Sequence, residues 1–139
     1  MSDLPAARSR PGAALAEFAL VMPIFALILV AALDFGRVYY HSQIIENCAR
    51  NGALYESDPA SPLRSKYLDY KKAALADAGN LNPALTESQI TSASGSGTYG
   101  ATVAVTVKYD VPTLSSYFGF SNFALSRTVT MRVVPLVPN

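Results

Sequence analysis

The side chains of this 139-residue chain that could do chemistry are few, and the most informative of them is Glu17. This carboxylate lies near the start of a long apolar run, where a membrane would make it costly. Glu17 could snorkel to the lipid headgroups. Alternatively, a peptidase that cuts after Gly12 would leave Ala13 as a new N-terminus, one helical turn from Glu17. The carboxylate could then pair with that amine, or with the amine of a neighbouring subunit, and set the register of a helical assembly.

The other reactive residues do not form a catalytic set. His41 and Cys48 are the only histidine and the only cysteine, and they would share one face of a helix. A metal site would need a further ligand, and no other His or Cys exists. Cys48 has no partner for an intrachain disulfide, which leaves an intermolecular disulfide open. We therefore predict a protein that is not an enzyme, with no catalytic residues, cofactor, metal or small-molecule substrate.

The composition gives no sign of nucleic-acid binding, because the formal net charge is only +1 and Lys and Arg do not cluster. Half of the residues are hydrophobic, and they are densest in residues 13–33, AALAEFALVMPIFALILVAAL. As a helix this stretch would span roughly 31 Å, about the hydrocarbon thickness of a bilayer. We predict a transmembrane helix over residues 13–33, kinked at Pro23.

Three identities compete for this segment. It could be a cleaved secretory signal, because Val30 and Ala32 offer a small-residue pattern for cleavage before Leu33. The acidic Glu17 argues against a signal, whose apolar core is preceded by basic residues. The segment could also be a plain signal anchor. A segment of the pilin type is favoured by a Gly that is followed, after four residues, by Glu17 and the aromatic Phe18.

Residues 10–51 resemble the N-terminal segment of TadE-like pseudopilins, which are minor, pilin-like components of the tight-adherence (Tad, type IVc) pilus machinery. The length of the chain, and Phe18 after the Glu where major pilins usually carry Tyr, favour the minor class. The features that carry the resemblance are Gly12, the Glu17-Phe18 pair, Pro23 within the helix, Asp34-Phe35-Gly36-Arg37 and Ala49-Arg50-Asn51-Gly52-Ala53.

The resemblance implies processing by a prepilin peptidase, with residues 1–12 as the cleaved leader. It implies a role in pilus assembly, initiation or tip structure, and other pilin or pseudopilin subunits as partners. The count of basic residues on the two sides of residues 13–33 is a tie. The resemblance places the chain in a bacterial inner membrane, N-terminus cytoplasmic and C-terminal domain periplasmic, with incorporation into an extracellular pilus as one outcome. The alternative is a membrane-anchored or secreted periplasmic binding module without a pilus role.

The helical pattern continues past the membrane segment, through residues 34–56. Small and β-branched residues recur there with 4-3-4-3 spacing, which is typical of a helix packed closely on a partner. That partner could be this chain's own sheet or another subunit. The positions are Val38, Ser42, Ile45, Ala49 and Gly52.

Residues 57–139 predict a soluble α+β domain of the pilin-like kind. Residues 57–62 read as a loop because of Pro59 and Pro62. A second, short helix is predicted over residues 65–78, with Ser65 as its N-cap and Gly79 as its stop. Its apolar side would be formed by Tyr67, Leu68, Leu75 and Ala78.

The last third changes to a period of two, which predicts a three-stranded antiparallel sheet covered by the helices. Strands are expected over residues 87–93, 99–111 and 125–134, with a turn at residues 94–97. The connection over residues 112–122 either caps the core or touches a partner. Its apolar residues are Leu114, Tyr117, Phe118 and Phe120.

Overall fold

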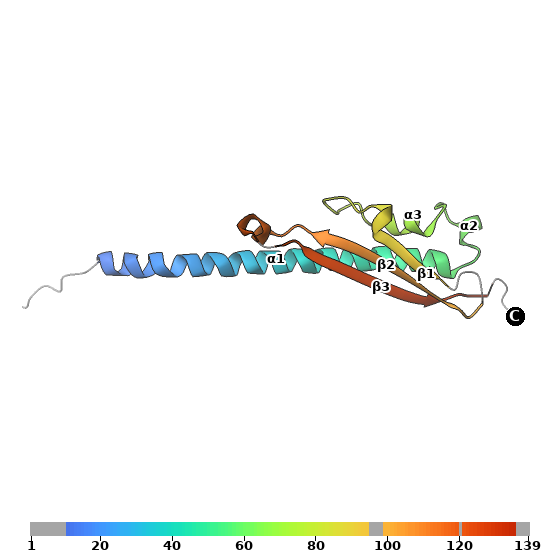
Figure 1. Ribbon diagram of the computed structural model, residues 1–139, viewed down its shortest axis with the longest axis horizontal. Helices are drawn as coiled ribbons and strands as arrows, with labels where there is room; N and C mark the ends of the chain where they lie inside the picture. The colour runs from blue at the N-terminus through green and yellow to red at the C-terminus, as the bar shows by residue number, and fades with distance from the viewer. Residues whose placement is uncertain (1–10, 95–98, 120, 136–139) are drawn as a thin grey trace, which may run out of the picture.

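The computed structural model describes residues 11–94, 99–119 and 121–135. One helix, α1 (Pro11–Ser57), contains 47 residues and is about 70 Å long at the standard rise. Its first part projects alone, and every other element lies along its second part (Figure 1). The predicted continuous helix and the α+β fold are confirmed.

The sheet consists of β1 (Ile90–Ser94), β2 (Thr102–Val111) and β3 (Phe123–Arg132), in the order β1-β2-β3. Both pairings are antiparallel, and Val105 of β2 lies between Ser92 and Val129 of its neighbours. Inward and outward positions alternate along β2 as the sequence predicts. Most of the turn expected at residues 94–97 lies outside the described residues.

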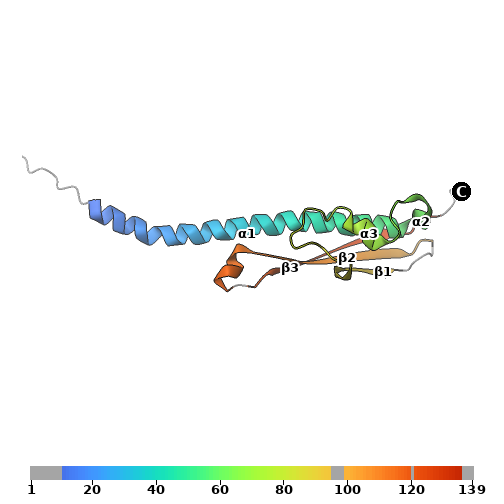
Figure 2. The same cartoon turned by 90° about the horizontal axis from the view of Figure 1, so that it is seen from above.

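The inner face of the sheet packs on the second part of α1 (Figure 2). Of the predicted helix positions, Ser42, Ile45, Ala49 and Gly52 are buried, so their partner is this chain's own sheet. Gly52 allows the closest approach, because a Cβ there would lie 3.1 Å from Val105 Cγ1. The fully buried β2 side chains opposite them are Val103, Val105, Val107 and Val111.

The region after α1 differs from the prediction. The expected loop is confirmed only over residues 58–60, because α1 ends at Ser57 and a short helix, α2 (Ser61–Arg64), begins inside the expected range. Pro62 lies in the first turn of α2, where proline is well tolerated. Ser65 is the C-cap of α2 and not an N-cap. Its hydroxyl accepts a hydrogen bond from the Tyr67 backbone N–H at 3.1 Å, a local contact that competes with helix formation.

The predicted second helix is therefore shorter and begins later, as α3 (Tyr70–Leu75). Asp69, with an extended backbone, is its N-cap residue. Leu68 precedes the helix and is 82% exposed, so its expected place on the apolar side is wrong. The buried residues of α3 are Ala73 and Ala74, and the Ala74 methyl would lie 3.3 Å from a Cβ at Gly52.

The first strand also begins later than expected. A 3-10 turn, η1 (Glu87–Gln89), takes the place of its first three residues. The Gln89 side chain accepts a hydrogen bond from the Thr86 backbone N–H at 2.9 Å, which completes a capping box and favours a helical turn.

The connection between β2 and β3 contains a second 3-10 turn, η2 (Leu114–Phe118), which ends at Gly119 with a φ of 87°. Only glycine adopts this left-handed conformation readily. Leu114 is half-buried. Of the four apolar residues singled out in this connection, Phe120 and the side chains of Tyr117 and Phe118 lie outside what the structure describes.

Candidate functional site

The bare half of α1, residues 12–33, has no cover from the rest of the described protein. Its large apolar side chains are exposed: Leu20 is 77% exposed and Phe25 is 64% exposed. The helix is long and apolar enough to cross a membrane by length and composition, and only 6% of its most apolar window is buried. A core helix of a soluble protein would be mostly buried, so the exposure favours a surface for lipid or for another apolar helix.

The residues singled out for processing and assembly all lie at the free end of this bare half. Gly12 and Ala13 are in the first turn of α1, which begins at Pro11. Glu17 and Phe18 follow about one turn later, and both are exposed. The helix continues through Pro23 without interruption, and Figure 2 shows a bend in its first third. Proline within a helix is the commonest cause of such a bend.

Asp34 marks the point where the bare half ends and the covered half, residues 34–57, begins. Although it is a carboxylate, it is only 8% exposed. Its two oxygens accept hydrogen bonds from the backbone N–H groups of Leu114, at 2.6 Å, and Ser115, at 2.9 Å. These bonds attach η2 to α1 at the membrane-proximal end of the domain.

The charge of Asp34 is stabilised by this arrangement. Burial raises the pKa of its carboxyl, but the N–H donors of Leu114 and Ser115 and the nearby Arg37 charge lower it further, so that the net pKa lies below its ordinary value. In the sequence, Asp34 stands out only as part of the motif Asp34-Phe35-Gly36-Arg37. Its partners lie about 80 residues further along the chain, and no local signal indicates them.

Cys48 lies in the core between α1 and the sheet and is fully buried. Burial, with a contribution from the charge of Asp77, raises the pKa of its thiol to about 11. An intermolecular disulfide at Cys48 would therefore require the helix and the sheet to separate, because the thiol is neither accessible nor ionised in the folded domain.

His41 is also held by contacts within the folded domain. Its ring stacks on Tyr109 with centroids 5.6 Å apart, and its Nδ1 bonds the carbonyl oxygen of Arg37 at 2.7 Å. Within residues 11–94, 99–119 and 121–135 no group of three or more potential metal ligands occurs.

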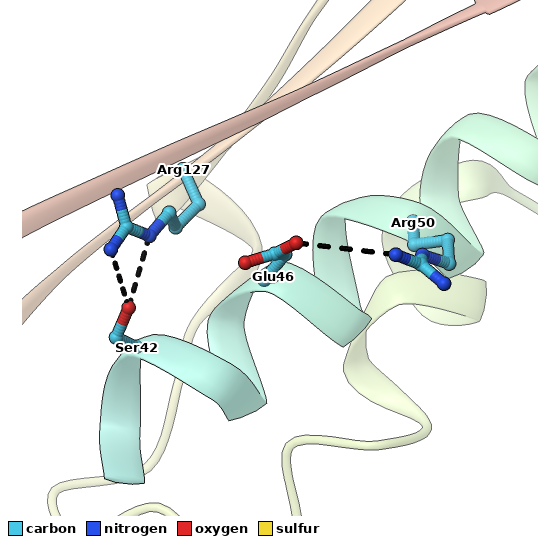
Figure 3. A network of polar contacts seen from close by, with 4 residues as sticks. All are labelled: Ser42, Glu46, Arg50 and Arg127. Carbon is cyan, nitrogen blue, oxygen red and sulfur yellow. Dashed lines mark hydrogen bonds and ion pairs between the residues drawn. The ribbon is translucent and has the colours of Figure 1, made fainter. Parts of the chain in front are cut away.

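One polar contact crosses from β3 to α1 in the covered half (Figure 3). The guanidinium of Arg127 donates to the Ser42 hydroxyl from Nε at 3.0 Å and from Nη2 at 2.6 Å. One turn further along α1, the Glu46 Oε1 and Arg50 Nη2 atoms lie 4.0 Å apart, and both side chains are in contact with solvent. Such a solvated pair within one helix adds little stability, whereas the Arg127 contact with Ser42 joins β3 to α1.

Among the described residues, the exposed apolar surface and the buried carboxylate of Asp34 both lie on α1. No match to the chain is found among curated proteins or solved structures. A family model does match, over residues 12–54. The match begins at Gly12 and includes the bare half and nearly all of the covered half. It confirms the resemblance stated for residues 10–51 and covers about a third of the chain. Residues 12–54 are thus similar to the family described as TadE-like protein.

Proposed function

We propose that this chain is a minor, pilin-like subunit of a tight-adherence pilus and that it assembles through the bare half of α1. One observation carries the proposal: a single unbroken helix is apolar and uncovered over residues 12–33 and is packed under its own sheet over residues 34–57. The TadE-like match extends over both halves and begins at the predicted processing site. A helix of this kind can leave the bilayer for a bundle of similar helices, because both surroundings are apolar.

Processing after Gly12 would complete this assembly element. The cut would give Ala13 a free amine one turn from Glu17, at the free end of the bare half. In apolar surroundings the Glu17 carboxylate then has a natural partner in that amine or in the amine of a neighbouring subunit. Phe18 beside it would contribute apolar contact to the same junction.

The sheet, α2 and α3 all lie along the covered half of α1, so the folded domain would lie on one side of the membrane. The TadE-like resemblance supports the periplasm as that side. The short N-terminal segment would lie in the cytoplasm, where the prepilin peptidase would act. The role is assembly, initiation or tip structure, and the partners are other pilin-like subunits.

The N-terminal sequence of the protein extracted from membranes tests processing. A start at Ala13 supports the proposal. A start at Leu33 would mean a secreted protein, and an intact N-terminus would mean a simple anchor, so either result contradicts it.

The role of Glu17 is tested by Glu17→Ala, scored by counting pili on intact cells. We expect the variant to insert in the membrane at wild-type levels while pili are lost or sparse. Glu46→Ala is the matched control, because Glu46 is a partly exposed carboxylate of the same helix whose only described ion pair is the weak one with Arg50. Normal piliation in Glu17→Ala would remove the assembly role from this residue.

A further inference from the structure

A groove with both polar and apolar lining residues lies directly beyond the bare half of α1. Its volume is about 590 Å³, within the range of small-molecule sites. It is bounded by one turn of α1, the loop at residues 80–83 and the segment at residues 112–116. The polar and aromatic side chains that line it are Arg37, Tyr40, His41, Asn80, Asn82 and Ser116.

The groove carries positive charge without an acidic lining residue. Arg37 is exposed, and within the described residues its guanidinium has no carboxylate within 4 Å. The charge of Arg37 contributes to lowering the pKa of Asp34, but the oxygens of Asp34 accept hydrogen bonds from the N–H groups of Leu114 and Ser115. A guanidinium with hydroxyl and amide donors around it is suited to a phosphate group.

The depth of the groove matches the headgroup layer of a bilayer. If the apolar segment ends at Leu33, Arg37 lies about 6 Å and His41 about 12 Å further along the helix. The headgroup region extends about 5–7 Å beyond the hydrocarbon on each side. The Arg37 side of the groove would therefore lie among lipid phosphates, with Tyr40 where interfacial aromatic residues are enriched.

We propose that this groove binds the phosphate of an anionic phospholipid headgroup, with Arg37 as the charged contact and the Asn80 and Asn82 amides as further donors. The proposal rests on the membrane insertion in the proposed function, but not on the pilus role. A bound headgroup would hold the start of the covered half of α1 at a defined depth and rotation in the bilayer.

The test uses the intact protein in nanodiscs that contain equal amounts of phosphatidylglycerol and phosphatidylcholine, with retained lipid measured by native mass spectrometry. We expect phosphatidylglycerol to be preferred, and Arg37→Gln to reduce its retention about tenfold through the loss of a charged hydrogen bond. Arg50→Gln is the matched control, because Arg50 is an exposed arginine of the same helix outside the groove. Its retention is expected to equal that of the wild type.

Asn80→Asp is a second variant that leaves α1 unchanged and places a like charge beside the phosphate, so it should also reduce retention. Wild-type retention in both groove variants would overturn the proposal. Displacement of the lipid by an equal concentration of inorganic phosphate would also overturn it, because the site would then take free phosphate. Glu17→Ala is expected to retain phosphatidylglycerol normally, which separates this result from any failure of the pilus role.

Discussion

The two halves of α1 belong to one continuous helix, yet they are built for different surroundings. The bare half exposes bulky residues such as Leu20 and Phe25, whereas the covered half places small residues such as Ala49 and Gly52 against the sheet. Close backbone approach requires small residues, while contact with lipid or another helix requires apolar bulk. Residue size, as well as hydrophobicity, therefore distinguishes a helix segment that packs on its own sheet from one whose apolar surface is left exposed.

The largest expected effects, on domain stability and on membrane insertion, come from placing an aspartate in each half of α1. Ala49→Asp would bury an unpaired carboxylate in the core and is expected to destabilise the domain by about 3–5 kcal/mol. Leu27→Asp, on an open position of the bare half, is expected to leave domain unfolding unchanged and to lower membrane insertion by about 2.5–3.5 kcal/mol at most. Thermal unfolding of the intact protein in detergent and the fraction recovered in membranes measure the two effects separately.

Asn47→Asp is the control for Ala49→Asp, because it places the carboxylate on the exposed side of the same helix. Its unfolding temperature should match that of the wild type. If Leu27→Asp lowered the unfolding temperature as much as Ala49→Asp, the two halves would not be independent and the comparison would fail.

A smaller effect is expected from adding volume at two glycines of α1. Gly52→Val would push two methyl groups toward Val105 and Ala74, and overpacking of this kind costs about 1–3 kcal/mol. Gly36→Val meets open space, since a Cβ there has no atom within 4 Å. We expect denaturant unfolding to show a loss for Gly52→Val alone. An equal loss for both would contradict packing against Val105 and Ala74 as the cause, because valine has a higher helix propensity than glycine at either position.

The smallest effect concerns the boundary between the halves. Asp34→Asn removes one of two acceptors, so one of the N–H groups of Leu114 and Ser115 would face an amide NH₂. Their hydrogen exchange should become severalfold faster, while β2 amides stay unchanged. Because the folded pKa of Asp34 is lowered, its contribution is present above the ordinary carboxyl pKa and is lost as pH falls below it. Wild-type exchange rates at both amides in the variant would contradict this role.

Much of the fold could be predicted from local patterns. The unbroken apolar run predicted the bare half, and the alternation of Val103, Val105 and Val107 predicted β2, because these periods follow from backbone geometry. The short elements could not be placed as well. The pattern predicts Ser65 and Leu68 within a helix, but the hydrogen bond between the Ser65 hydroxyl and the Tyr67 N–H and the start of α2 at Ser61 move the boundaries. Such local contacts differ in free energy by too little for a sequence pattern to decide between them.

By itself the sequence determined the apolar helix and the spacing of Gly12 and Glu17. It also determined the small and β-branched residues that recur with 4-3-4-3 spacing along α1, and the alternation of buried and exposed residues in the strands. Each of these depends on neighbours within a few turns of the same chain. Only the tertiary structure decided that these small residues pack on the chain's own sheet and that Cys48 is buried in the core. It also decided that Asp34 accepts hydrogen bonds from η2, some 80 residues away. It also formed the groove beside Arg37 from three separate segments. The reason is physical: which distant groups meet depends on how the sheet docks, and that is decided by the packing of the whole domain.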